Sequence, residues 1–419
     1  MSSSLMEQNM NVVGVNPRKR KASEEPHINL TFSLDELNQD LLERVLSKLP
    51  ASSFFRLRSV CRRWNSVANS ATFQFACSQI PFRDPWFLMV DQYLDQSTVF
   101  DTTEGNWKNL SHPMFLQQSH GCKPIPVASS GGLICYHASS NGLAVCNPIT
   151  GVRRELPPIG EASESQTLHA IAMYSSQKDD DPTAYKVVMI FGEFSSLAFR
   201  VFDSKKNMWE EEVMLVQKGE KSTQSDGVGY ESTVYFLSKT GDIVATNMQK
   251  SPFKQYSSVR LNENGDDVIC FLTYSGTIMA CNLAEKTFFE YPRLLPAYFE
   301  YSIDVVESKG EMLVVVLSEF LETASLRVWR FSNEERSWQQ VAAMPPSMSH
   351  ELYKKKVDIN CVCHKDMIFI CVCSDDFSSY VMCNLVTNQW MELPKCYMNG
   401  KAKEFMSAFC FEPRVEAVV

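Results

Sequence analysis

Apolar residues near the N-terminus follow a helical period. From Ser33 onward they recur every three or four positions, which places them on one face of an amphipathic helix, and Pro50 ends this first stretch. A second stretch follows, and the hydroxyl of Ser52 or Ser53 can cap its start. The apolar positions of the two stretches are Leu37, Leu41, Leu42, Val45, Leu46 and Leu49, then Leu57, Val60, Cys61, Trp64, Val67 and Ala68. This spacing predicts a small helical unit over residues 31–80.

The segments on either side of this unit have different patterns. Residues 1–30 are rich in Ser, Asn, Lys and Glu and show no apolar period, which predicts a flexible tail. Beyond Asp84 and Pro85, short runs of Val, Ile, Phe, Tyr and Cys are separated by Gly, Asn, Asp and Ser. Such runs are typical of strands joined by turns, so residues 86–419 are predicted to be all-β.

A phrase recurs seven times in the β region, with some drift. In each copy an apolar run ends in a polar residue, and an aromatic residue usually follows six positions later. The polar positions are Asp101, Asn147, Asp203, Asn247, Asn282, Ser332 and Asn384, at successive spacings of 46, 56, 44, 35, 50 and 52 residues. The aromatic positions are Trp107, Trp209, Phe253, Phe288, Trp338 and Trp390, and the second copy has Arg153 instead. A period of about 50 residues is typical of kelch-type propeller blades.

The repeat therefore predicts a kelch-like β-propeller of about seven blades, with six as the alternative. The polar residue would start a turn, and the aromatic residue would pack between neighbouring sheets, since a single blade cannot bury its own faces. The apolar run Phe405–Phe411 can add a strand to the blade that begins at Trp86–Val90 and so close the ring. Two stacked β domains made of unrelated strand pairs are the other architecture that this pattern leaves open.

Charge is distributed unevenly along the chain. The net charge is −9, and residues 1–79 carry ten Lys/Arg against seven Asp/Glu, leaving thirty against forty-two in the remainder. An acidic body repels phosphate backbones, so we expect no direct nucleic-acid binding. The cluster Pro17–Lys21 is similar to a short nuclear-import signal, and a solubilising cluster would look the same. No signal peptide or membrane-length apolar run is visible, so we expect a soluble protein of the nucleus and/or cytoplasm, no membrane contact and reduced cysteines.

The segment from Leu37 to Val67 resembles the F-box, whose pattern combines Leu-Pro, paired apolar residues and a Val-Cys-(Arg/Lys)-x-Trp core. The matching positions are Leu41, Leu42, Val45, Leu46, Leu49, Pro50, Leu57, Val60, Cys61 and Trp64. Asn38 stands where the family usually carries proline, which loosens the turn before the first helix. From Leu34 to Val419 the chain resembles the plant F-box/kelch-repeat proteins, and the phrases DPWFLMVD and FCFEPRVEAVV are similar to one group among them.

This resemblance implies the substrate-recognition subunit of an SCF-type ubiquitin ligase. In such a complex the F-box binds a Skp-like adaptor, the adaptor binds a cullin, and the propeller binds a target protein for ubiquitination and proteasomal degradation. The alternative is a transcriptional or scaffold cofactor that carries an F-box but acts without degrading its partner. In both cases the chain itself is expected to be non-catalytic.

An F-box has to offer an apolar surface that a second protein covers. The predicted adaptor-binding residues are Leu37, Leu41, Leu42, Val45, Leu46, Leu49, Pro50, Leu57, Val60, Cys61 and Trp64. Because a few central apolar anchors dominate most interfaces, we nominate Leu41, Leu42, Leu57, Val60 and Cys61 as these anchors. The basic residues nearby would suit an acidic adaptor, although a solvated helix face would look the same; they are Arg44, Arg56, Arg58, Arg62 and Arg63.

Other candidate chemistry has little support. The run CVCHKDMIFICVC, from Cys361 to Cys373, could supply four zinc ligands, but residues two apart share one face of a strand and the spacing does not match zinc modules. Packing in the core is favoured, and no metal or cofactor is predicted. No GxxxxGK[ST], GxSxG or HExxH motif is present, so no catalytic residue is predicted and a sialidase-like or oxidase propeller is disfavoured. Lys354–Lys356 are expected on an exposed loop that either contacts the target or is simply solvated.

Overall fold

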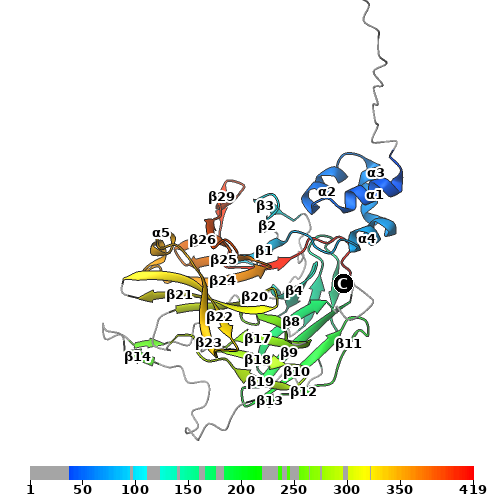
Figure 1. Cartoon of the computed structure of the whole chain (residues 1–419). Coiled ribbons are helices and arrows are strands. Elements are labelled where there is room, and N and C mark those ends of the chain that lie inside the picture. Colours follow the sequence, from blue (N-terminus) through cyan, green and yellow to red (C-terminus); the bar gives the residue numbers. More distant parts are fainter. Residues whose placement is uncertain are drawn as a thin grey trace, which may run out of the picture.

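The computed structural model describes most of the chain from Leu37 to the C-terminus. The described residues are 37–94, 98–110, 123–138, 142–159, 166–175, 184–218, 235–237, 243–245, 254–263, 265–273, 276–295, 301–320 and 322–419. The predicted tail, the cluster Pro17–Lys21 and the repeat copy with Asn247 and Phe253 lie outside them. Within the described part, a helical module of residues 37–80 lies beside a ring of β-sheets (Figure 1).

The helical module packs its helices around one small core. Its elements are α1 (Gln39–Ser47), α2 (Ala51–Arg58), α3 (Arg62–Ser66), the 3₁₀ turn η2 (Val67–Asn69) and α4 (Ala71–Ser78). The second predicted stretch is thus two helices, because the chain leaves the helical conformation at residues 59–61. The buried core residues come from every one of these elements and are Leu42, Leu46, Phe54, Trp64, Val67, Phe73 and Cys77.

Two helix starts differ from the sequence-based expectation. Asn38 stabilises the start of α1, because its side-chain Oδ1 accepts the N–H of Asp40 at 3.1 Å and so replaces the proline usual in F-boxes. The prediction that Ser52 or Ser53 caps α2 is wrong. Pro50 occupies the N-cap position and offers no side-chain hydrogen bond, and the Ser52 hydroxyl bonds to the propeller instead.

The β region forms six four-stranded antiparallel blades in the residues that the structure describes. From the inner strand outward, blade 1 is β30 (Ser407–Phe411), β1 (Trp86–Val90), β2 (Thr98–Asp101) and β3 (Asn106–Asn109), and blade 2 is β4 (Ile125–Ser130), β5 (Leu133–His137), β6 (Leu143–Cys146) and β7 (Arg153–Glu155). Blade 3 is β8 (Leu168–Ser175), β9 (Tyr185–Glu193), β10 (Ser196–Asp203) and β11 (Met208–Trp209), and blade 4 is β16 (Ser258–Glu263), β17 (Asp266–Leu272), β18 (Ile278–Asn282) and β19 (Thr287–Glu290). Blade 5 is β20 (Tyr301–Ser308), β21 (Glu311–Phe320), β22 (Thr323–Ser332) and β23 (Ser337–Ala343), and blade 6 is β24 (Asp358–His364), β25 (Met367–Ser374), β26 (Phe377–Asn384) and β27 (Gln389–Glu392).

Shorter elements decorate this ring. They are β12 (Val213–Met214) beside β10, β13 (Val216–Gln217) parallel to β19, the hairpins β14 (Tyr235–Leu237) with β15 (Ile243–Ala245) and β28 (Cys396–Met398) with β29 (Lys401–Lys403), helix α5 (Pro346–Ser349) and the 3₁₀ turn η5 (His350–Leu352). No helix in the described part of the chain combines the length and the apolar character needed to cross a membrane.

The ring closes through the C-terminal strand. β30 pairs with β1 from Trp86↔Phe411 to Val90↔Ser407, as the apolar run at Phe405–Phe411 predicts. The inner strands then contact one another in the cyclic order β4, β8, β16, β20, β24, β30 and back to β4. Six blades, the alternative given above to seven, is therefore the number that the described residues form.

In five of the six described repeat copies, the polar residue shapes the turn between the third and fourth strands of a blade. Asp101 Oδ1 accepts the backbone N–H groups of Thr103 at 2.9 Å and Glu104 at 3.2 Å, the pattern of an Asx turn. The same bonds to the residues two and three positions later occur in blades 2, 3, 4 and 6, at Asn147, Asp203, Asn282 and Asn384. The polar position of the repeat therefore recurs because its side chain accepts the backbone N–H groups of this turn.

The aromatic residues of the repeat lie between blades. Each described one packs in the apolar cluster between its own blade and the preceding blade; they are Trp107, Trp209, Phe288, Trp338 and Trp390. Three of the indole N–H groups also donate to a proline carbonyl that follows the outer strand of the preceding blade, in the pairs Trp107 with Pro394 at 2.9 Å, Trp209 with Pro157 at 2.8 Å and Trp338 with Pro292 at 2.8 Å. The carbonyl of a proline that follows the outer strand of one blade therefore binds the tryptophan of the next blade.

The cysteine-rich run forms strands β24 and β25. Cys361 and Cys371 are almost fully buried and pack in the clusters on either side of blade 6. Burial raises the pKa of Cys363 and of Cys373 to about 12, so these thiols stay protonated. Among the described residues, no group of three or more His, Cys, Asp or Glu is placed to hold a metal ion.

Candidate binding surfaces of the helical module

Three large apolar side chains of the helical module point into solvent. Leu41 and Val45 lie one turn apart on α1 and are 52% and 54% exposed, and Val60, in the turn between α2 and α3, is 65% exposed. Leu42 and Leu46, one position further along α1, face the core. Adjacent helical residues project about 100° apart, so Leu42 and Leu46 face the core while Leu41 and Val45 face solvent.

The remaining predicted adaptor-binding residues divide by exposure. Leu42 was nominated as an anchor, but at 1% exposure it belongs to the module's own core, as do Leu46 and Trp64. That nomination is corrected, because a fully buried side chain cannot anchor a partner. The residues that are half-buried against the core are Leu37, Leu49, Leu57 and Cys61, and Pro50 is exposed.

Helix α4 adds an exposed aromatic residue that sequence reasoning missed. Phe75 is 68% exposed on α4, which packs against α1. The predicted apolar stripe ended at Ala68. Ser70, which caps α4, and the buried pair Phe73 and Cys77, four positions apart, are the signals that could have extended it.

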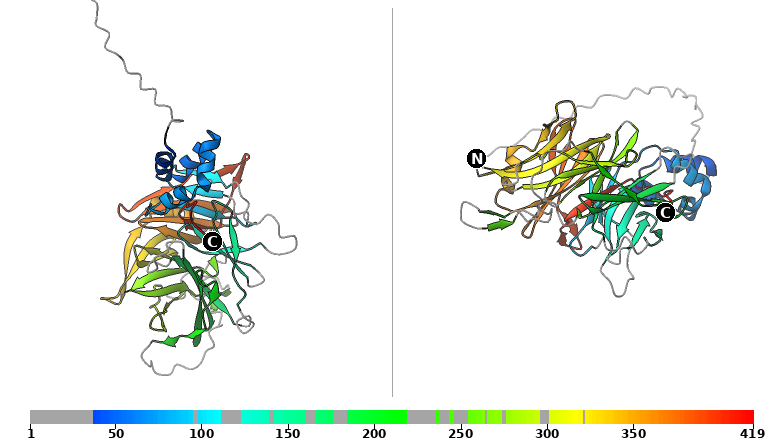
Figure 2. Two further views of the ribbon diagram at one scale, coloured as in Figure 1. Left: turned by 90° about the vertical axis from the view of Figure 1, so that its right-hand side faces the viewer. Right: turned by 90° about the horizontal axis from the view of Figure 1, so that it is seen from below.

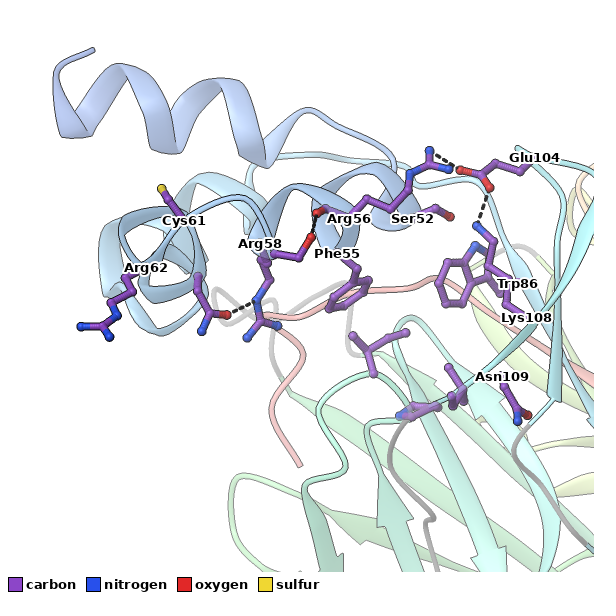
Figure 3. Close-up of a pocket in the computed structure, with 15 residues that line it drawn as sticks. Ser52, Phe55, Arg56, Arg58, Cys61, Arg62, Trp86, Glu104, Lys108 and Asn109 are labelled. Atoms are coloured by element: carbon purple, nitrogen blue, oxygen red, sulfur yellow. Dashed lines mark hydrogen bonds and ion pairs between the residues drawn. The ribbon is translucent and has the colours of Figure 1, made fainter. Parts of the chain in front are cut away.

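The five predicted arginines do not form one patch. Arg63 is turned onto the module itself, where it donates to the carbonyl of Leu37, and Arg44 is exposed on α1. The other three, Arg56, Arg58 and Arg62, line a pocket of about 890 Å³ between the module and the propeller (Figure 3). We call this cavity the junction pocket. The five arginines are therefore not available to a single partner as one basic surface.

The module side of the junction pocket is fixed to blade 1 by polar contacts. The Ser52 hydroxyl donates to Asp101, which also accepts Lys108 Nζ at 2.6 Å. Glu104 pairs with Arg56 at 2.6 Å and with Lys108 at 2.8 Å. Burial by itself would raise the pKa of Asp101, but the hydrogen bonds from Lys108, Ser52 and the Glu104 N–H outweigh it and hold that pKa below its usual value.

Apolar packing at this junction explains one irregular repeat copy. Ala51 and the half-buried Phe55 of α2 join the apolar cluster between blades 1 and 2, together with Trp86 and Ile149. This is the seam whose repeat copy carries Arg153 where an aromatic residue is usual. The helical module therefore supplies apolar surface at the seam where the repeat does not.

The C-terminal tail holds the module from a second side, and Figure 2 shows the C-terminus near the helices. The guanidinium of Arg414 donates to the carbonyls of Ile80 and Pro81, each at 3.1 Å, just after α4. Asn147 Nδ2 in turn donates to the carbonyls of Arg414 and Ala417, both at 2.9 Å. The module, the tail and blade 2 are thus joined through one residue.

The comparisons with known proteins agree with this architecture. The F-box domain family matches residues 34–75, and the KIB1-4 beta-propeller family matches residues 99–349. F-box only protein 13 of Arabidopsis thaliana is 44% identical, over 97% of this chain and 91% of the relative. F-box only protein 6 of the same plant is 25% identical over 86% and 69%, and an F-box/kelch-repeat protein is 24% identical over 86% and 82% of the two chains.

Proposed function

The chain belongs to the plant F-box proteins with a KIB1-4 β-propeller, and from this membership we propose that it is the substrate-recognition subunit of an SCF-type ubiquitin ligase. The F-box module binds a Skp-like adaptor and, through it, a cullin. The propeller binds a target protein for ubiquitination and degradation. The names of the relatives describe binding modules, which fits a non-catalytic receptor.

The exposed apolar residues of the module carry this proposal. Leu41, Val45 and Val60 leave apolar surface in water although the module has its own packed core. A partner that covers them gains about 25 cal/mol for each Å² of apolar surface removed from water. A protein interface of ordinary size buries about 800 Å² on each partner, and its central apolar anchors dominate the affinity.

A charge placed in this surface tests the proposal. Leu41→Asp combined with Val60→Asp puts two carboxylates into the adaptor contact and should weaken adaptor binding at least about a hundredfold, since a buried unpaired charge costs several kcal/mol. Val216→Asp is the matched control, because Val216 is 66% exposed on β13, beside blade 4 and across the ring from blade 1. Binding is measured by co-purification and calorimetry with the Skp-like adaptor. Unchanged binding by the double variant, with an unchanged thermal midpoint, contradicts the proposal.

The propeller face away from the module offers one surface to the target. The helical module contacts the turns between third and fourth strands, whereas the connections between blades lie at the other ends of the antiparallel strands. On that far face, Lys355 Nζ lies 3.7 Å from the ring centre of Phe377, and Lys354 Nζ lies 5.0 Å from that of Tyr353. These rings hold two exposed ammonium groups in place for a partner.

Degradation and location need their own measurements. If the protein acts as a degradation receptor, a partner captured by the propeller accumulates when the proteasome is blocked, and it is ubiquitinated only when adaptor binding is intact. An unchanged partner lifetime favours the cofactor alternative. We place the protein in the nucleus and/or cytoplasm, and replacing Arg18–Lys21 with alanine should reduce the nuclear fraction if this cluster is an import signal.

A further inference from the structure

The junction pocket carries more positive charge than its own carboxylates neutralise. Arg56 and Lys108 are paired with Glu104 and the buried Asp101. Arg58 has one neutral partner, because its Nε donates to Asn65 at 3.2 Å, and Arg62 is exposed at the rim. In the described part of the chain, neither of these two arginines has an ion-pair partner. A guanidinium has five N–H donors, so most of those on Arg58 face the pocket unused.

This local charge is opposite to that of the whole chain. The net charge is −9, and the region beyond the module is the acidic part. Two unneutralised guanidinium groups on such a protein attract a negatively charged partner and orient it, because complementary charge speeds and directs association. Paired donors in a fixed plane also match the two oxygens of a carboxylate.

An apolar surface lies next to these cations. In Figure 3, Phe55 lies between Arg58 and Trp86. The Arg58 guanidinium carbon is 5.8 Å from the ring centre of Phe55, so the ring limits where the cation can move. Leu110 and Ile149 complete the apolar part of the lining. The pocket can thus hold an apolar group and an anion side by side.

The pocket exists because two folded units meet. α2, α3 and the turn between them form one wall, and residues from blades 1 and 2 form the other. Helix α1, which carries Leu41 and Val45, contributes no residue to the lining, so the pocket is a surface separate from that part of the adaptor contact. Its volume of about 890 Å³ is within the range of specific ligand pockets, which is about 300–1,000 Å³.

We propose that the junction pocket binds an acidic segment of the target protein, with one carboxylate on Arg58, another facing Arg62 at the rim, and a neighbouring apolar side chain against Phe55. That the segment belongs to the target rests on the proposed function, whereas its chemistry rests on the pocket alone. Bound there, the target lies directly beside the module that carries the ligase.

A short peptide tests the chemistry directly. The probe is fluorescein-labelled Glu-Glu-Phe-Glu-Glu, and its binding to the full chain is followed by fluorescence anisotropy. Arg58→Glu and, separately, Arg62→Glu should each weaken binding at least about tenfold, because each replaces an attracting charge with a repelling one. Arg327→Glu, at an exposed arginine of β22 in blade 5, is the matched control and should bind the probe like the unaltered chain. A peptide with Ser in place of Phe should bind less tightly, and one with Lys in place of Glu should not bind.

The outcomes separate this inference from the proposed function. A probe that does not bind, or that binds the Arg58 and Arg62 variants as tightly as the unaltered chain, overturns the inference. The thermal midpoint should be unchanged by Arg62→Glu, because Arg62 is exposed. Adaptor binding is measured on the same variants: loss of the probe with adaptor binding kept supports the assignment of the pocket to the target, and a parallel loss of adaptor binding overturns it. Conversely, a Leu41→Asp, Val45→Asp double variant, with both changes on α1 and outside the pocket lining, should lose the adaptor and keep the probe. Loss of adaptor binding alone therefore cannot be mistaken for loss of the pocket.

Discussion

Arg414 offers a direct test of how rigidly the helical module is held on the propeller. Its side chain is 16% exposed and pairs with Glu412 at 2.6 Å and Glu416 at 3.0 Å, whose side chains are 17% and 7% exposed. The same guanidinium donates to the carbonyls of Ile80 and Pro81 in the segment that follows α4. We expect Arg414→Ala to loosen the module.

The magnitude follows from these contacts. Each hydrogen bond from a charged group to a carbonyl contributes about 1.5 kcal/mol or more, and removing one member of a buried ion pair costs about 3–5 kcal/mol because the other charge stays behind. Arg414 and Glu412 keep some contact with solvent, at 16% and 17% exposure, so we reduce this to about 2–3 kcal/mol for Arg414→Ala. Arg330→Ala is the matched control, because its pair with Glu311 at 3.2 Å is 43% and 58% exposed and should contribute less than about 1 kcal/mol.

Urea unfolding of the two variants measures the difference, and limited proteolysis of residues 79–85 shows whether the module separates from the propeller before the ring unfolds. Arg414→Ala should lower the unfolding midpoint and increase cleavage at this segment, while Arg330→Ala should do neither. If both variants unfold at the same urea concentration and are cut equally, the tail does not hold the module and the reasoning is wrong.

Three further predictions concern single residues. Asp101→Asn should lower the thermal midpoint near neutral pH. Because the folded-state pKa of Asp101 is depressed, the difference in thermal midpoint between the variant and the unaltered chain should shrink as the pH falls below about 4. A difference that stays constant with pH contradicts the role of the ionised carboxylate. Asn147→Ala should cost about 2–3 kcal/mol of folding free energy, and Asn384→Ala about 1 kcal/mol. Both variants lose an Asx turn, but only Asn147, which is fully buried, also bonds to the C-terminal tail. Equal losses of folding free energy in urea unfolding would refute this. Half-exposed Cys61 should react with a thiol reagent in the native protein. Burial raises the pKa of Cys361 well above its usual value, so Cys361 should react only after unfolding. If a chelator lowers the thermal midpoint, the cysteines bind a metal instead.

Much of this protein is determined by local sequence. The three-to-four spacing locates the helical module, and the match from Leu37 to Val67 identifies the F-box without any structure. The repeat predicts the blades because its polar residue closes a turn two and three positions away and its aromatic residue lies at a set distance along the same hairpin. Such features depend on residues close together in the chain, where backbone geometry leaves few alternatives.

The tertiary structure decided what depends on distant residues. Leu41 and Leu42 look alike in sequence, and only the packing of α1 against Phe54 and Phe73 shows that Leu42 is inside and Leu41 outside. The number of blades follows from ring closure between β1 and β30, which are more than 300 residues apart. The contacts of Arg414 likewise join opposite ends of the chain, and the junction pocket joins α2 and α3 to residues of blades 1 and 2. No local pattern encodes which of these segments meet, because their proximity results from the curvature and closure of the whole ring.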